Sequence, residues 1–277
     1  MADLEKLATG IRRSRRNLIK VGAVGSAAIF ASLTNTRPSQ GDDNCLGNED
    51  DRCTKCFLKG TNIQTANGDR KIEDLAVGDL LPTVFRGLCP VQWIGYYRQK
   101  KSDQATPWVK DVLPVRVARS ALSPGVPHAD LFVTKAHALF IDGVLVSVGD
   151  LINGTTITLY DARERDELEF FHIKLERHNT IYAEGAPCET LRNVEEGAIN
   201  FAEYLRNYGH PTTQEAPCAP LLSCTGGRRE IRSRLRSAIS PWIDRRQKLD
   251  IIRDELEERG IAVLRGRNSS SDCRVSA

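Results

Sequence analysis

A series of short strand-like segments separated by turns is the feature that most constrains the fold of this 277-residue chain. The segments are rich in β-branched and aromatic residues, which is typical of strands. Asn67-Gly68 and Asp142-Gly143 predict hairpin turns, because these residues tolerate positive φ. No long helical pattern interrupts the series, so we expect an all-β domain. The expected strands include residues 62–65, 91–94, 114–117, 131–133, 139–141, 144–146, 156–159 and 170–173.

After Thr190 the period of the apolar residues changes to that of helices. Residues 193–208 are expected to form an amphipathic helix, and residues 228–259 give a longer helical pattern in which Pro241 starts a second helix or kinks the first. We therefore predict a helical extension over residues 192–267 and a disordered tail over 268–277. The apolar residues expected to share one face of the longer pattern are Ile231, Leu235, Ile239, Ile243, Leu249, Ile252 and Leu256.

The charge of the chain bears on its partners. The net charge is only +3, which gives no indication of a nucleic-acid partner. Residues 228–267 contain 12 Lys or Arg against 7 Asp or Glu, so this part of the extension is net +5. That excess indicates either a partner surface for an acidic protein or lipid headgroups, or a solvated helix face with ion pairs.

The N-terminus has the pattern of an export signal. Arg15 and Arg16 are followed by Leu18, Ile19 and Lys20, and then by an apolar run over residues 21–33. This resembles a twin-arginine (Tat) signal and implies export to the periplasm or the medium. The run of 13 residues is shorter than the roughly 20 that a spanning helix needs, so no stable membrane span is expected. The alternative is a basic, disordered arm. Residues 34–55 are polar and acidic, which indicates a flexible linker.

Three ordered motifs lie in the β-rich part of the chain. They are Cys56–Gly68 with Glu73, Leu75, Gly78 and Asp79 after it, then Val133–Phe140, then His178–Gly185. These motifs resemble the Hint domain, the Hedgehog/intein self-processing fold, and the phrase Phe170–Ile173 resembles its bacterial stand-alone branch. The resemblance covers residues 56–191 and implies an all-β, horseshoe-like domain, here with a helical C-terminal extension.

The resemblance implies a role for each candidate site residue. Cys56 would attack the carbonyl carbon of Lys55, which converts the amide into a thioester. His137 would protonate the leaving nitrogen, since an imidazole both takes and gives a proton near neutral pH. Thr134 would hold the same peptide by hydrogen bonding, and His178 would assist later steps. No cofactor and no metal is implied.

Three further residues are expected to have non-catalytic roles. His172 lies near the position where splicing members carry an aspartate, and we interpret it as structural. If His172 and His178 lie on one extended strand, their even spacing puts both on the same face. Glu73 and Asp79 are interpreted as turn and capping residues.

The C-terminal end of the resemblance departs from the splicing members. Those members end in an asparagine, which cyclises to release the downstream segment, whereas this stretch ends at Thr190. Complete splicing is therefore not expected. The hypothesis that remains is a single-turnover cleavage at Lys55-Cys56, with the chain's own N-terminal segment as the substrate.

Other interpretations remain open. Cys56 is one of eight cysteines and would also suit a disulfide with Cys53 or Cys45, or half of a zinc site with Cys53. The whole domain would also suit a non-catalytic, exported scaffold with a protein partner on its helical tail. A cysteine–histidine hydrolase acting on another substrate is a third interpretation.

Overall fold

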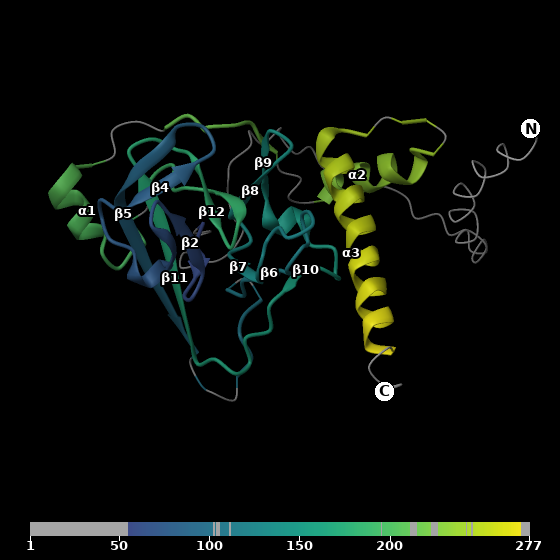
Figure 1. Cartoon of the computed structure of the whole chain (residues 1–277), viewed down its shortest axis with the longest axis horizontal. Helices are drawn as coiled ribbons and strands as arrows, with labels where there is room; N and C mark the ends of the chain where they lie inside the picture. Colours follow the sequence, from purple (N-terminus) through teal and green to yellow (C-terminus); the bar gives the residue numbers. More distant parts are fainter. Residues whose placement is uncertain are drawn as a thin grey trace, which may run out of the picture. The chain divides into compact units, whose positions relative to one another are not determined.

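The computed structural model describes residues 55–101, 103, 106–110, 112–194, 196–210, 215–222, 227–241, 243–244 and 246–272. They form a β-rich domain followed by helices (Figure 1). The strands are β1 (Phe57–Leu58), β2 (Asn62–Thr65), β3 (Gly68–Lys71), β4 (Leu80–Thr83), β5 (Gly87–Lys100), β6 (Val115–Val117), β7 (Leu131–Val133), β8 (Ala138–Ile141), β9 (Val144–Ser147), β10 (Ile157–Leu159), β11 (Glu167–Leu175), β12 (Thr180–Ala183), β13 (Ala186–Glu189) and β14 (Leu221–Leu222). Short 3-10 turns follow β3 (η1, Ile72–Asp74) and β9 (η2, Val148–Leu151).

The sheet is continuous, and its order is β10-β6-β7-β1-β11-β5-β4-β12-β13-β8-β9-β14, with β2 and β3 attached at β12. The long strand β5 connects the half of the sheet that contains β11 to the half that contains β4. Its first residues pair with β4, and the rest pairs with β11, which lies beside it in Figure 1. All these pairings except β9 with β14 are antiparallel, so the predicted all-β domain is confirmed.

Both predicted hairpins form. Asp142 and Gly143 join β8 to β9 with φ angles of 49° and 80°, as expected for a turn that needs two positive φ values. In the β2–β3 hairpin the two linking residues are Ala66 and Asn67, and Gly68 is already paired with Thr65. That turn therefore lies one residue earlier than predicted, with Gly68 at a φ of 99° beginning the second strand.

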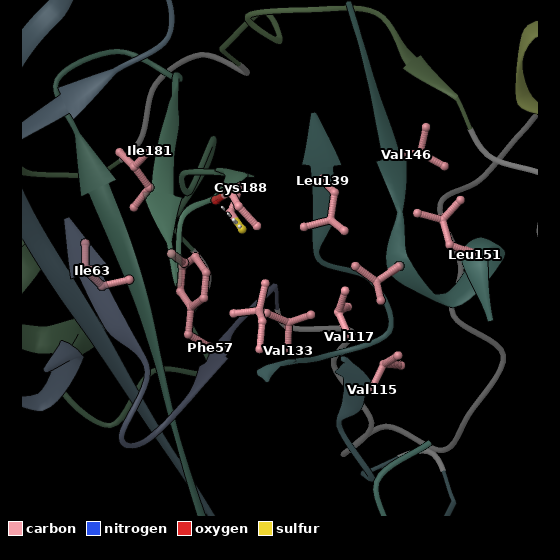
Figure 2. Packing of buried hydrophobic residues seen from close by; sticks show 14 of the residues in the cluster. Phe57, Ile63, Val115, Val117, Val133, Leu139, Val146, Leu151, Ile181 and Cys188 are labelled. Atoms are coloured by element: carbon pink, nitrogen blue, oxygen red, sulfur yellow. Dashed lines mark hydrogen bonds between the residues drawn. The ribbon is translucent and has the colours of Figure 1, made fainter. Parts of the chain in front are cut away.

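Side chains from distant strands meet in one large core. Figure 2 shows Phe57 of β1, Val133 of β7, Leu139 of β8 and Cys188 of β13 around the same apolar centre. None of these four residues has exposed surface. A fully buried side chain of this size stabilises the fold by about 1.5–3 kcal/mol through the hydrophobic effect. The core therefore fixes strands that are far apart in the sequence.

The first helix is shorter than predicted. Helix α1 spans Phe201–Tyr208, so the expected helix over residues 193–208 was wrong for its first half. The chain before α1 instead bonds to β5: the N–H of Ile199 donates to the carbonyl of Tyr96, and the Asn200 side chain bonds the backbone of Tyr96 and Ile94. These bonds to a neighbouring strand replace the helical ones.

The longer helical pattern splits into two helices. Helix α2 spans Gly227–Ile239 and α3 spans Lys248–Asp272, so Pro241 lies in the connection and begins neither helix. Helix α3 runs to Asp272, which is five residues into the stretch expected to be disordered. None of the helices in the described ranges is long and apolar enough to cross a bilayer. The export signal, residues 34–54 of the linker and residues 273–277 lie outside the described residues.

The prediction of a single apolar face on the extension was wrong. Three of its members, on α3, are buried in the main core, whereas the four others are exposed. The cause is a polar contact between the helices. Ser233 and Arg236 of α2 both bond the buried carboxylate of Asp250 on α3, which turns the polar side of α2 inward. The buried residues are Leu249, Ile252 and Leu256, and the exposed ones are Ile231, Leu235, Ile239 and Ile243.

Candidate functional site

Cys56 is held by a pair of hydrogen bonds, one of which involves the N–H of the Lys55-Cys56 peptide. The N–H of Cys56 donates to the hydroxyl of Thr134 at 2.9 Å, and the N–H of Thr134 donates to the carbonyl of Cys56 at 2.9 Å. Cys56 is a thiol with no exposed surface. The two residues suggested as its disulfide partners, Cys45 and Cys53, lie outside the described residues.

Packing in the core sets the position of this peptide. Phe57 and Val133, which follow Cys56 and precede Thr134 in the chain, are partners across β1 and β7 and point into the core in Figure 2. Because successive side chains on a strand point to opposite faces, burying these two residues directs their neighbours to a common side. The bonds between Cys56 and Thr134 extend the same strand pairing.

His137 lies close to the same peptide. Its backbone N–H donates to the carbonyl of Thr134 at 3.1 Å, and this turn brings the two residues together. The ring is fully buried and packs on Phe57 with 4.3 Å between ring centroids. Among the described residues, neither ring nitrogen has a hydrogen-bond partner of normal geometry. The backbone carbonyl of Lys55 raises the pKa of the ring, so this carbonyl lies near it.

The pKa of His137 follows from its surroundings. Burial lowers the pKa from 6.5 to about 4, the nearby charge of Lys55 lowers it too, and the Glu189 carboxylate and the Lys55 carbonyl oppose them. The ring is therefore neutral at neutral pH and able to accept a proton. Once protonated, it is a strong proton donor.

Glu189 is a site residue that the sequence analysis missed. Its side chain is 2% exposed, and its Oε1 accepts the N–H of Ala138 at 2.8 Å. Its Oε2 lies 3.5 Å from the Nζ of Lys55 and 3.5 Å from the Nε2 of His178. A charged residue within the closing strand Ala186–Glu189 was the signal available in the sequence, because such a residue is rarely buried without a partner.

His178 is placed by the loop that follows α1 in the chain. Its Nδ1 accepts the N–H of Cys218 at 2.9 Å, and its own N–H donates to Glu215. Burial lowers the pKa of His178, but the side chains of Cys218 and Glu189 outweigh it and raise the pKa to about 9. At neutral pH the Nε2 atom, which lies 3.5 Å from Glu189, therefore carries a proton. Glu189 thus lies between His178 and the side chain of Lys55 and contacts both.

His172 joins the cluster from β11. Its ring is fully buried, and the ring centroids of His172 and His137 are 5.4 Å apart. Burial lowers the pKa of His172 well below 6.5, and the charges of His137, Lys55 and His178 lower it further. The condition of one continuous strand for His172 and His178 is not met, because β11 ends at Leu175 and β12 begins at Thr180. The two histidines are neighbours because the chain turns between these strands.

The remaining predicted residues hold turns. Glu73 accepts the N–H of Gly60 at 2.8 Å, while Asp79 accepts the N–H of Ala76 and pairs with Arg70. Both contacts match the roles that the sequence predicted. Across the part of the chain that the structure describes, no group of three or more His, Cys, Asp or Glu side chains is arranged to hold a metal ion.

The chain thus forms a β-domain in which a threonine and a histidine lie next to one of its own peptide bonds. The Hint domain family matches residues 55–195, which is half of the chain. The chain therefore belongs to the Hint domain family. The match extends four residues beyond the expected end at 191.

Solved structures with a similar fold are inteins and an intein-like domain. The gp41-1 intein is 16% identical and has a TM-score of 0.35, with 49% of this chain and 98% of that one covered. For the DnaB intein of Synechocystis sp. PCC 6803 the identity is 12%, the TM-score 0.35 and the coverage 50% and 99%. A bacterial intein-like domain from Clostridium thermocellum is 15% identical, with a TM-score of 0.33 and coverage of 50% and 99%. TM-scores of this size carry no conclusion about function. A search of curated proteins found no match.

Proposed function

We propose that the chain cleaves itself once, at Lys55-Cys56, through a thioester made by an N-to-S acyl shift. The observation that carries the proposal is the enclosure of this peptide, with Thr134 on the Cys56 N–H and His137 beside the Lys55 carbonyl. Membership of the Hint family supports the same reaction class. Thr134 and His137 are the residues that the motif Val133–Phe140 pointed to.

The acyl shift moves the acyl group of Lys55 from nitrogen to sulfur and one proton from sulfur to nitrogen. The sulfur of Cys56 bonds to the carbonyl carbon of Lys55, and the carbon–nitrogen bond breaks. The proton that leaves the thiol passes to His137, which is neutral at neutral pH, and then to the nitrogen of Cys56. Thr134 holds that nitrogen through its N–H and so keeps the leaving group in place. The product is a thioester with a free amino group on Cys56.

Hydrolysis completes the proposed reaction. Water adds to the thioester carbon, the carbon–sulfur bond breaks, and the products are a carboxylate on Lys55 and the regenerated thiol of Cys56. One proton of the water ends on the sulfur, and the other leaves when the carboxylic acid ionises. The ring of His178 lies beside Glu189 and is our candidate for giving the sulfur its proton. No downstream cut follows, because Thr190 lacks the side-chain amide on which cyclisation depends.

The test is intact-mass spectrometry of the full-length chain. With dithiothreitol, the wild type is expected to release a fragment that begins at Cys56, and Cys56→Ala is expected to remain whole. Cys89→Ala is the matched control, because Cys89 is also a thiol but lies on β5. Wild-type protein that remains whole under thiol, like Cys56→Ala, contradicts the proposal.

A second candidate function is a non-catalytic scaffold, and one observation favours it. Ile231 and Leu235 of α2 are 66% and 61% exposed, and Arg232 and Arg234 lie beside them in the sequence. An apolar stripe with arginines at its sides suits a partner protein with an acidic, apolar groove. The intact-mass experiment separates the two functions, because a scaffold stays whole whatever residue stands at position 56.

We further propose that the protein acts after export, on the basis of the twin-arginine pattern at residues 15–20 and the apolar run after it. Replacing Arg15 and Arg16 with lysine is expected to retain the protein in the cytoplasm, as read by cell fractionation. Export that is unchanged by this substitution contradicts the assignment.

A further inference from the structure

A buried carboxylate links the two sides of the Lys55-Cys56 peptide. One oxygen of Glu189 accepts the N–H of Ala138, the residue next to His137, at 2.8 Å. Its other oxygen faces the ammonium group of Lys55 at 3.5 Å. Glu189 therefore contacts the residue before the cleavage site and the first residue of β8, which directly follows His137.

Two cationic neighbours stabilise the charge on Glu189. Burial alone raises the pKa of this carboxyl group, but His178 and Lys55 outweigh burial, and the pKa is lowered overall. A carboxylate that is 2% exposed is costly unless it is paired and hydrogen-bonded. Among the described residues, removing the lysine leaves His178 as the one cation within ion-pair distance of Glu189.

The side chain of Lys55 is enclosed rather than free. It is 23% exposed, although it belongs to the segment that cleavage would remove. Ion pairs on the surface of the same domain are more open: Lys59 and Glu169, 2.6 Å apart, are 45% and 22% exposed. A neutral side chain at position 55 would leave Glu189 short of a partner, and an acidic one would repel it.

We infer that Glu189 is a specificity-determining and positioning residue that selects a basic side chain immediately before the cleavage site. The inference rests on the proposed function. By holding the Lys55 ammonium group and the N–H of Ala138, Glu189 sets the Lys55 carbonyl against the His137 ring. Lysine or arginine at position 55 then allows the acyl shift, and alanine or glutamate slows it.

A double-mutant cycle on the full-length chain tests the inference. The rate of hydroxylamine-induced cleavage is measured for the wild type, Lys55→Ala, Glu189→Gln and the double variant. Each single substitution is expected to slow cleavage by about tenfold or more, because small misplacements of reacting groups are costly. In the Glu189→Gln background, Lys55→Ala is expected to have little further effect. Lys59→Ala and Glu169→Gln are the matched control pair and are expected to cleave at the wild-type rate.

The outcomes separate this inference from the proposed function. Wild-type protein that never cleaves contradicts the proposed function. If the wild type cleaves and the effects of Lys55→Ala and Glu189→Gln multiply, or if Lys55→Glu cleaves as fast as wild type, the inference is overturned. The same cycle is measured as melting temperatures in the uncleavable Cys56→Ala background. There a coupled shift supports the pairing, and additive shifts contradict it.

Discussion

The hydroxyl of Thr134 accepts a 2.9 Å hydrogen bond from the N–H of Cys56, and the N–H of Thr134 returns one to the Cys56 carbonyl. A side chain thus contacts the nitrogen that the proposed acyl shift would release. The buried neighbours Phe57 and Val133 hold the two backbones in register. Because this contact uses the side-chain hydroxyl of Thr134, a substitution that removes the hydroxyl tests its role.

Replacing Thr134 with valine removes the hydroxyl and keeps the shape of the side chain. Cleavage is expected to slow by about ten- to a hundredfold, because a buried N–H then lacks its acceptor and the leaving nitrogen is no longer held. Thr134→Ser keeps the acceptor and is expected to remain close to the wild type. Time courses of intact mass give the rates, and equal rates for valine and threonine at this position contradict the role.

The burial of Cys56 predicts a preference for small nucleophiles. Cys56 has no exposed surface, so any nucleophile must enter through a transient opening, which admits small molecules more readily than large ones. We expect mercaptoethanol to cleave the protein faster than glutathione does at equal thiolate concentration. A peptide thioester in solution serves as the reference for intrinsic reactivity. A protein that shows the same rate ratio as the peptide has an open site, contrary to this prediction.

His137 makes stability depend on pH in a defined window. Its folded pKa of about 4 lies below its ordinary value of 6.5, so its contribution is fully present above pH 6.5. The contribution is lost as pH falls from 6.5 through 4, and it amounts to about 3 kcal/mol. Urea unfolding at several pH values is expected to show a shallower acid loss for His137→Gln than for the wild type. His128→Gln, at a half-exposed histidine, is the control, and parallel curves for His137→Gln and wild type contradict the assignment.

The two helices of the extension are expected to respond differently to truncation of a leucine. Leu256 of α3 is 5% exposed and packs in the main core, whereas Leu235 of α2 is 61% exposed. Leu256→Ala is expected to lower the free energy of unfolding by about 2–5 kcal/mol, and Leu235→Ala by less than about 0.5 kcal/mol. Similar losses in urea unfolding would mean that α2 buries the stripe that the structure exposes.

Local pattern was enough to predict most of the β-domain. Strand composition and the Asp142-Gly143 turn gave strands and a hairpin that the structure confirms. Ordered motifs pointed to Thr134 and His137, which the structure brings to the Lys55-Cys56 peptide. These features depend on residues close together in the sequence, whose preferences act over one strand or one turn.

Features that depend on distant partners were not predictable. Glu189 contacts Lys55 across 134 positions in the chain, and no periodicity reports such a contact. The first half of the expected helix 193–208 bonds to β5 instead, about 100 residues earlier. Helix α2 turns its polar side toward Asp250, so its apolar spacing indicated a helix correctly but not which side of that helix contacts α3.

The central claim is that the carbonyl of Lys55 moves onto the sulfur of Cys56, and trapping that carbonyl tests it most directly. Hydroxylamine attacks a thioester and leaves a hydroxamate on the acyl group. Mass spectrometry of the treated wild type is expected to find a fragment ending in a Lys55 hydroxamate and a second fragment beginning at Cys56, with neither in Cys56→Ala. A wild-type chain that stays intact, or a hydroxamate that forms equally in Cys56→Ala, contradicts the account.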